Sequence, residues 1–281
     1  DWSSDVCSSD LVAGLPDDIQ AQGLAGLMDV VLHPQFAQNK LVYITYHKRP
    51  AGYVPQPPPP GGGRGPAAPP GVITLARGTW DGTNLVGMKD IFTATATGNA
   101  ARIIFGRDGS LFMSVGYGDP TPAEYMQADA SLMMKMPPQD GMKLDGKTLR
   151  LKDDGTVPRD NPFVGKAGYR PEIYTLGHRN ILGLTLHPET GAVWSVENGP
   201  NGGDEVNELL PGHNYGWPVV NNGRFYLGPR VSVNAFREGM DPPVAFWVPA
   251  IAPSGLLFYT GDKFPQWKNN LFIGEIGRAH V

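Results

Sequence analysis

Residues 186–196 read LHPETGAVWSV, and this stretch decides the fold class. A Leu-His-Pro segment leads through a polar turn that ends in Gly191, and a run rich in β-branched and aromatic residues follows. Two short apolar runs joined by such a turn are typical of antiparallel strands, because glycine readily adopts the positive φ that the turn needs. The stretch therefore predicts a β-hairpin.

Three further stretches have the same organisation. They are residues 32–44 (LHPQFAQNKLVYI), 105–115 (FGRDGSLFMSV) and 258–273 (FYTGDKFPQWKNNLFI). The four units recur at intervals of roughly 70 to 80 residues. A long repeat of hairpin units is typical of a β-propeller, in which each blade is one antiparallel sheet. Four units predict a truncated propeller, since they account for only part of a larger ring.

The composition agrees with an all-β fold and limits the possible partners. The 281 residues include 37 Gly and 28 Pro but only 18% charged residues, which suits many short strands and turns. The net charge of −4 argues against a nucleic-acid partner. No apolar run approaches the roughly 20 residues that a membrane-spanning helix needs, so no membrane-spanning segment is expected.

One insertion interrupts the predicted strands. Residues 54–71 (VPQPPPPGGGRGPAAPPG) separate probable strands at 41–46 and 72–77, and they predict an extended Pro/Gly-rich hairpin loop. A peptide-docking role for this loop is the alternative.

The two ends of the chain are related to each other. Residues 5–10 (DVCSSD) and 276–281 (IGRAHV) can be encoded by opposite strands of one oligonucleotide. This symmetry predicts that residues 1–11 and 276–281 derive from a sequencing adapter and are not native. The native part would then be a partial propeller domain over residues 12–275. Cys7, the single cysteine of the sequence, belongs to the predicted artefact and says nothing about redox compartment.

The most specific motifs lie in the third repeat. They are residues 177–180 (GHRN), 197–207 (ENGPNGGDEVN) and 214–218 (NYGWP). With residues 26–34, 102–116, 149–158 and 251–255, they resemble the soluble sugar (glucose/aldose) dehydrogenases that depend on pyrroloquinoline quinone (PQQ). The resemblance covers essentially everything between the two ends. It implies a six-bladed propeller, here truncated to about four to five blades.

The resemblance also implies a function. Such an enzyme oxidises an aldose sugar to the lactone by hydride transfer to PQQ, with calcium assisting, and passes the electrons to an external acceptor. A periplasmic or secreted location is what the family suggests. The alternatives are a propeller that has lost the redox chemistry and only binds carbohydrate or protein, and a calcium-dependent lactonase.

Cofactor-binding residues are expected around the GHRN motif. PQQ is a flat tricarboxylate with two reactive carbonyls, so its site needs planar cations and amide hydrogen bonds. The resemblance assigns Arg179 and Asn180 to the quinone, and we add Asn198 from the following motif. A buried arginine that merely bridges blades is the alternative for Arg179.

A calcium loop is expected next to these residues. Calcium is bound by six to eight oxygens, often backbone carbonyls and carboxylates. The resemblance assigns the carbonyls of Gly199 and Pro200 and the carboxylate of Asp204 to the metal. A turn stabilised by the aspartate side chain is the alternative, and Glu205 is expected to face away or to brace the loop.

The catalytic base is where the resemblance fails. The family has a histidine four residues before the arginine that matches Arg102, and this sequence has Gly98 there, with no other histidine nearby in the sequence. Asp119 is a weak candidate base. The catalytic residue is therefore unknown from the sequence, and restoring histidine at position 98 is the natural test.

Overall fold

The structure is a computed structural model that describes residues 12–21, 25–54, 70–118, 130–226 and 228–275. Most of the Pro/Gly-rich loop, Asp119 and the two predicted adapter remnants lie outside these residues, so the predictions about them stay predictions. Strands dominate the described part. Short helical segments interrupt them at α1 (Phe36–Asn39), α3 (Ala130–Met133) and the 3₁₀ turn η2 (Pro265–Trp267).

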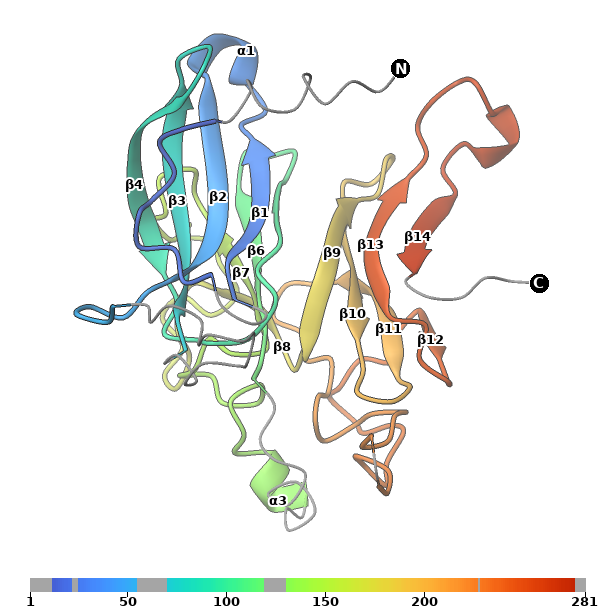
Figure 1. Ribbon diagram of the computed structural model, residues 1–281. Helices are drawn as coiled ribbons and strands as arrows, with labels where there is room; N and C mark the ends of the chain where they lie inside the picture. The colour runs from blue at the N-terminus through green and yellow to red at the C-terminus, as the bar shows by residue number, and fades with distance from the viewer. Residues whose placement is uncertain (1–11, 22–24, 55–69, 119–129, 227, 276–281) are drawn as a thin grey trace, which may run out of the picture.

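The described strands form three four-stranded antiparallel sheets and one two-stranded sheet (Figure 1). The first sheet contains β1 (Leu27–Leu32), β2 (Leu41–Lys48), β3 (Val72–Trp80) and β4 (Leu85–Thr93). The second contains β5 (Ile103–Phe105), β6 (Leu111–Val115), β7 (Lys147–Leu151) and β8 (Ile173–Leu176). The third contains β9 (Asn180–Leu186), β10 (Val193–Asn198), β11 (Asp204–Leu209) and β12 (Ala245–Trp247). The last contains β13 (Pro253–Phe258) and β14 (Leu271–Glu275).

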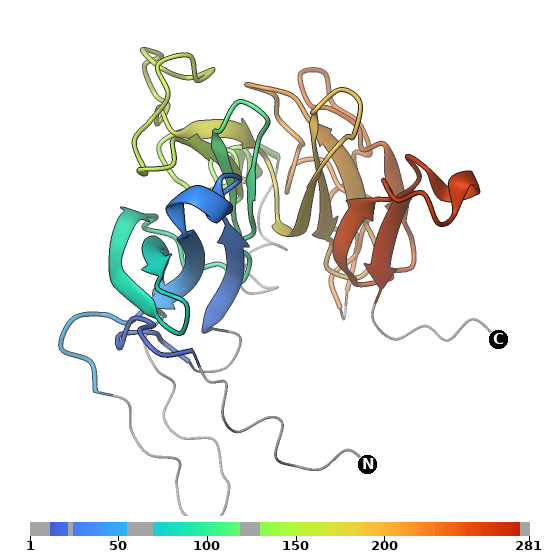
Figure 2. The same cartoon turned by 90° about the horizontal axis from the view of Figure 1, so that it is seen from above.

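The sheets are consecutive blades of a β-propeller. Within each sheet, strands that follow each other in the sequence are hydrogen-bonded neighbours, which is the up-and-down order of a propeller blade. Seen from above, the four sheets follow one another along an arc in chain order (Figure 2). The first strands also contact in succession, β1 with β5, β5 with β9 and β9 with β13. The predicted partial propeller is confirmed.

The four repeats found in the sequence are the opening hairpins of the four sheets. They form the pairs β1–β2, β5–β6, β9–β10 and β13–β14. In two of them the His-Pro histidine caps its own turn: Nδ1 of His33 accepts the backbone N–H of Gln35, and Nδ1 of His187 accepts that of Glu189. The repeat was visible in the sequence because its turn chemistry is local.

The same aromatic contact joins neighbouring blades at two places. In each, the turn histidine and an aromatic residue of the second strand pack against a phenylalanine of the next blade. The two trios are His33, Tyr43 and Phe105, and His187, Trp194 and Phe258. The histidine–phenylalanine ring centroids are 5.1 and 4.9 Å apart, both near edge-to-face. Both histidines therefore serve the packing of the blades.

The main core lies between the first and second sheets. Tyr43, Leu75, Leu111, Leu149 and Ile173 are fully buried there and come from five different strands. Burial of such side chains supplies most of the driving force for blade packing. In the described part of the chain, no helix is long and apolar enough to cross a membrane.

Candidate cofactor site

Arg179 lies between β8 and β9, where the chain passes from the second blade to the third. Its Nη1 donates hydrogen bonds to the backbone carbonyls of Asn198 (3.0 Å) and Gly199 (2.8 Å). Its guanidinium also packs over the indole ring of Trp217, 5.6 Å from the centroid. Only 9% of the residue is exposed. The planar cation is thus held in one orientation beside the hairpin that joins β10 to β11.

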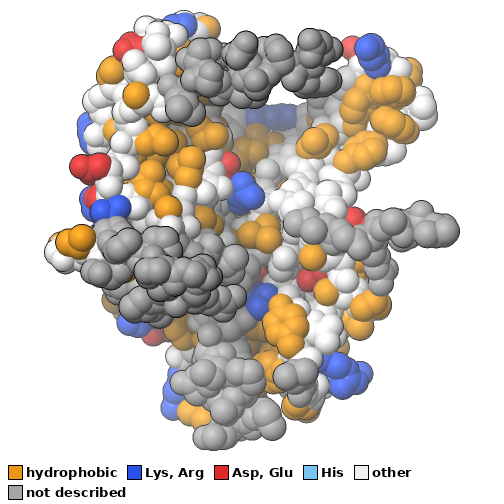
Figure 3. Space-filling model, in the orientation of Figure 1, with side chains coloured by type: hydrophobic (Ala, Val, Ile, Leu, Met, Phe, Trp, Pro, Cys, Tyr) orange, Lys and Arg blue, Asp and Glu red, His pale blue; other side chains and the backbone are white. Residues whose placement is uncertain are grey.

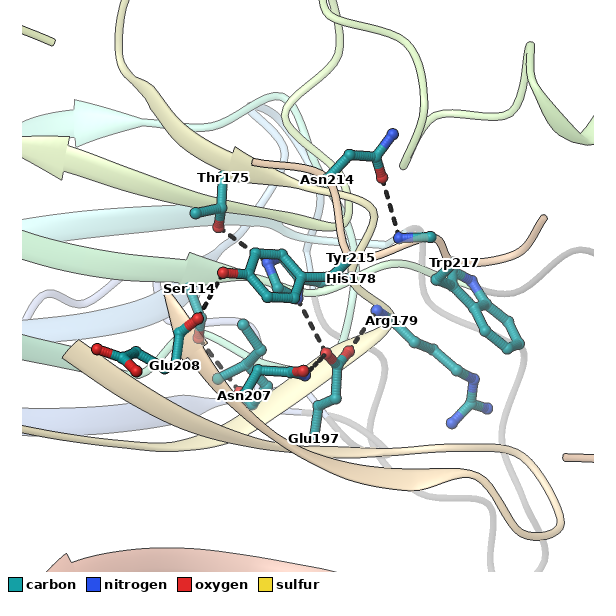
Figure 4. A network of polar contacts seen from close by, with 12 residues as sticks. Ser114, Thr175, His178, Arg179, Glu197, Asn207, Glu208, Asn214, Tyr215 and Trp217 are labelled. Carbon is teal, nitrogen blue, oxygen red and sulfur yellow. Dashed lines mark hydrogen bonds and ion pairs between the residues drawn. The ribbon is translucent and has the colours of Figure 1, made fainter. Parts of the chain in front are cut away.

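A buried polar network holds the backbone of Arg179 (Figure 4). Glu197 Oε2 accepts the backbone N–H of Arg179 at 2.8 Å. Glu197 Oε1 is 2.9 Å from Nδ1 of His178 and accepts a hydrogen bond from Asn207 Nδ2 at 3.1 Å. The other ring nitrogen of His178 is 2.8 Å from the hydroxyl of Thr175. The carboxylate of Glu197 therefore ties β10 and β11 to the GHRN motif.

Two asparagine amides flank Arg179. Asn180 and Asn198 are opposite each other where β9 pairs with β10. Both side-chain oxygens are buried, and neither has a hydrogen-bond partner among the described residues. A Cβ on Gly116 would lie 2.5 Å from the amide oxygen of Asn180, so only glycine leaves room for this amide. The structure thus brings together the three residues that the sequence assigned to the cofactor.

Asp204 is fully committed to backbone groups. Its Oδ1 accepts the N–H of Gly199 at 2.8 Å, and its Oδ2 accepts the N–H groups of Ile251 (2.7 Å) and Ala252 (2.9 Å). The residue is 1% exposed. Ala252 has a φ of 51°, and two successive N–H groups in such a turn form a nest that favours an anion. These contacts are those of the alternative prediction, in which the aspartate stabilises the loop.

The loop as folded does not fit a calcium ion. Both carboxylate oxygens of Asp204 face N–H donors, and the carbonyl of Gly199 faces the guanidinium of Arg179. A divalent cation at that carbonyl would lie against a positive charge. Within the described residues, no group of three or more His, Cys, Asp or Glu side chains could hold a metal ion. We therefore derive no step through calcium.

Glu205 does not face away from the site, which was the first of the two alternatives expected for it. It is buried and lines a small cavity together with Arg179, Glu197, Asn198 and Trp217. Burial, reinforced by the negative charge of Glu197, raises the pKa of the Glu205 carboxyl well above its ordinary value. The sequence could not indicate this, because the neighbour that matters lies on the opposite strand, β10.

Gly98 packs directly against the backbone of Gly116, so a side chain at this position requires the backbone to shift. A Cβ built on it would lie 2.1 Å from the carbonyl carbon of Gly116. A histidine distant in the sequence does lie close in space: Nε2 of His47, from β2, is 2.9 Å from the carbonyl oxygen of Gly98. His47 is buried, and its Nδ1 is 3.4 Å from the N–H of Gly26. Its ring therefore joins β2 to the connection between the first and second blades.

We expect Gly98→Ala to destabilise the protein by about 1–3 kcal/mol, because the added methyl group overlaps backbone atoms that must shift. Gly98→His should cost at least as much and should not raise the activity above that of the wild type. Urea unfolding measures the loss, and Gly255→Ala is the matched control, since nothing lies within 4 Å of a Cβ there. A stable, more active Gly98→His variant would contradict this geometry.

A buried lysine completes the surroundings of the site, and the sequence analysis missed it. Lys147 begins β7, and its Nζ donates to the carbonyls of Pro137 (2.7 Å), Pro138 (3.0 Å) and Asp145 (3.0 Å). The same segment carries Gln139, whose amide donates to the carbonyl of Trp217 at 2.8 Å. Lys147 thus anchors the loop that supports the tryptophan beneath Arg179.

Comparison with known proteins identifies relatives of this chain. The chain is 38% identical over 257 residues to the uncharacterised protein slr1608 of Synechocystis, covering 89% of this chain and 57% of that protein. It is 34% identical over 282 residues to the aldose sugar dehydrogenase YliI of Escherichia coli, covering 98% of this chain and 68% of YliI. It thus spans between about half and two thirds of the length of these relatives.

Solved structures give the same result. A crystal structure of a glucose dehydrogenase superposes with a TM-score of 0.78 at 34% identity, covering 94% of this chain and 70% of the other. The apo form of the E. coli aldose sugar dehydrogenase gives 0.77 at 33% identity with the same coverage. The glucose/sorbosone dehydrogenase family matches residues 2–281. This chain belongs to the glucose/sorbosone dehydrogenase family.

Proposed function

We propose that this chain forms the quinone-binding part of a PQQ-dependent aldose dehydrogenase. The observation that carries the proposal is the guanidinium of Arg179, held by the carbonyls of Asn198 and Gly199, next to a strand pair in which the buried amide oxygens of Asn180 and Asn198 have no partner in the described part of the chain. Two relatives support it by name, the aldose sugar dehydrogenase YliI and the quinoprotein glucose dehydrogenase B of Acinetobacter calcoaceticus, which is 32% identical over 206 residues, or 71% of this chain and 41% of that protein. The proposed activity is that of a whole protein. The relatives are longer than this chain.

The residues at the site fit a flat polycarboxylate. A bound PQQ would supply the carbonyl that accepts hydride from the anomeric carbon of an aldose, leaving the lactone. Arg179 would pair with a carboxylate of such a ligand, because a guanidinium suits planar, bidentate partners. The amide oxygens of Asn180 and Asn198 would accept a hydrogen bond from an N–H group of the ligand, and their Nδ2 groups would donate to its oxygens. The indole ring of Trp217 packs against the guanidinium of Arg179, and Glu197 accepts the backbone N–H of the same arginine. Both contacts keep the arginine in place.

The base that takes the proton of the sugar hydroxyl has no residue assigned to it. Gly98 carries no side chain, and Asp119 lies outside the described residues. The glycine at position 98 favours the second candidate function, a propeller that binds carbohydrate or protein without redox chemistry. A calcium-dependent lactonase lacks support, because several carboxylates would have to converge on one metal and no such cluster occurs among the described residues. An external electron acceptor and a periplasmic or secreted location remain expectations from the resemblance.

Calorimetric titration of PQQ into the protein tests the proposal. We expect Arg179→Gln to raise the dissociation constant about 10- to 100-fold, since hydrogen bonds to a charged group contribute roughly 1.5–3 kcal/mol. Arg159→Gln, at an exposed arginine on another loop, should leave it unchanged. Equal affinity of the two variants, or no binding by the wild type, would favour the carbohydrate- or protein-binding propeller.

Calcium forms a second arm of that titration. Because the oxygens of Asp204 and the carbonyl of Gly199 already have N–H partners, calcium alone should produce no binding heat and no change in melting temperature. Calcium binding by the protein alone would contradict this prediction for the loop that contains Gly199, Pro200 and Asp204.

A further inference from the structure

A short hairpin next to the candidate site places two arginines side by side. The segment 223–231 folds back on itself, with the N–H of Val231 bonded to the carbonyl of Gly223 and that of Phe225 to the carbonyl of Pro229. Arg224 and Arg230 are bridge partners across this hairpin. Directly opposite residues on antiparallel strands have their Cβ atoms about 5 Å apart and on the same face. The two guanidiniums therefore start from neighbouring positions.

The hairpin is fixed to the site loop. Arg224 exchanges two backbone hydrogen bonds of 3.0 Å with Asn201, the residue that follows Pro200. The segment that carries the hairpin is also tied down where Ser232 Oγ donates to the carbonyl of Val219. These hydrogen bonds fix the position of the arginine pair relative to the loop of the candidate cofactor site.

The pair is not explained by stability. Like charges directly opposite on a strand pair are destabilising. Both side chains are exposed, and within the described residues neither forms an ion pair with a carboxylate. Residues 219–240 contain three Arg and one Glu, in a chain whose net charge is −4. A local positive charge on an acidic protein points to an anionic ligand.

Exposed apolar side chains lie on the hairpin and in the segment that follows it. Tyr226 is 70% exposed at the tip of the hairpin, and Phe236 and Val233 nearby in the sequence are 67% and 88% exposed. Hydrophobic and basic side chains lie next to each other on the lower part of the molecule, below β11 and β12 (Figure 3). Aromatic residues and arginine are the types enriched in protein interfaces. An open surface of this composition suits a protein better than a small anion, which would need an enclosed site.

We propose that the Arg224–Arg230 hairpin docks an acidic protein. Carboxylates of the partner pair with the two guanidiniums, and Tyr226 and Phe236 contact apolar side chains of the partner. The hairpin lies next to the loop of the candidate cofactor site, so we identify the partner as the electron acceptor. This identification, and nothing else in the proposal, rests on the proposed function. The binding surface itself does not depend on it.

Fluorescence anisotropy with labelled poly-glutamate and poly(Glu,Tyr) at low ionic strength tests the surface without any activity. We expect the double variant Arg224→Gln, Arg230→Gln to weaken binding of both polymers at least about 10-fold. The control Arg159→Gln, Lys166→Gln removes the same charge from another exposed loop and should change affinity less than about 2-fold. Wild type should bind poly(Glu,Tyr) more tightly than poly-glutamate, and Tyr226→Ser with Phe236→Ser should abolish that preference.

Four outcomes would overturn the proposal. Equal losses in the two double variants would mean that only overall charge matters. Competition by submillimolar phosphate would assign the pair to a small anion. Selective binding to vesicles with anionic lipids would assign it to a membrane surface. A dimer of the protein alone that the arginine variant dissociates would assign it to self-association. If the wild type bound the polymers but did not bind PQQ, the proposed function would be rejected and the proposed docking surface would be retained.

Discussion

Glu197→Ala is expected to destabilise the protein by about 3–5 kcal/mol. The substitution removes the acceptor for three buried partners: the backbone N–H of Arg179, Nδ1 of His178 and the amide of Asn207. A buried donor left without an acceptor costs roughly 1–3 kcal/mol, and the space left by the side chain adds to the loss. Urea unfolding followed by tryptophan fluorescence measures the change in the free energy of unfolding.

The loss of Glu197 should also leave Arg179 less firmly held, and PQQ binding should weaken as stability falls. Glu197→Gln retains an oxygen that can accept the N–H of Arg179, so we expect it to cost less, about 1–2 kcal/mol, and to weaken PQQ binding less than Glu197→Ala does. Glu208→Ala, on the neighbouring strand β11, changes a half-buried glutamate and should stay within about 0.5 kcal/mol of wild type. If Glu197→Ala unfolds no more easily than Glu208→Ala, the network has no structural role.

The blades could be predicted because their signals are local. Each repeat contains its own turn residues and its own pair of strand-forming runs, and these became the opening hairpins of the four sheets. The remaining strands carry weaker signals. The three-residue strand β12 lies 36 residues after the end of β11 and is defined only by its pairing with that strand. Sequence periodicity cannot reveal an element that exists because of a distant partner.

The site was half predictable for the same reason. Arg179, Asn180 and Asn198 come together because β9 and β10 are adjacent and antiparallel, which the hairpin signal already implied. The resemblance assigned Asp204 to a metal, and the sequence could not show that the N–H groups of Ile251 and Ala252, more than forty residues further along the chain, bond to its Oδ2. Gly98 was treated as a vacant position for a histidine, whereas its contact with Gly116 excludes any side chain. Both contacts join segments that are distant in the sequence, so no local pattern could indicate them.

Lys147→Met is expected to cost about 2–4 kcal/mol. Methionine fills much of the same space but leaves the carbonyls of Pro137, Pro138 and Asp145 without their donor. The loop that supports Trp217 should loosen as well, so PQQ affinity should fall in parallel. Lys152→Met, at an exposed lysine just after β7, is the control and should change stability by less than about 0.5 kcal/mol.

The pH dependence of that loss has a defined sign. Burial lowers the pKa of Lys147 to about 7, from the ordinary value of 10.5 that applies to the unfolded chain. Between these two values the unfolded chain binds more protons at this residue than the folded protein does, so the stability that Lys147 contributes rises with pH. The difference in unfolding free energy between wild type and Lys147→Met should therefore be smallest below pH 7 and should widen toward about pH 10. A difference that narrows as the pH rises would mean that the three carbonyls hold the ammonium strongly enough to outweigh its burial, so that Lys147 acts as a permanent cation in the loop.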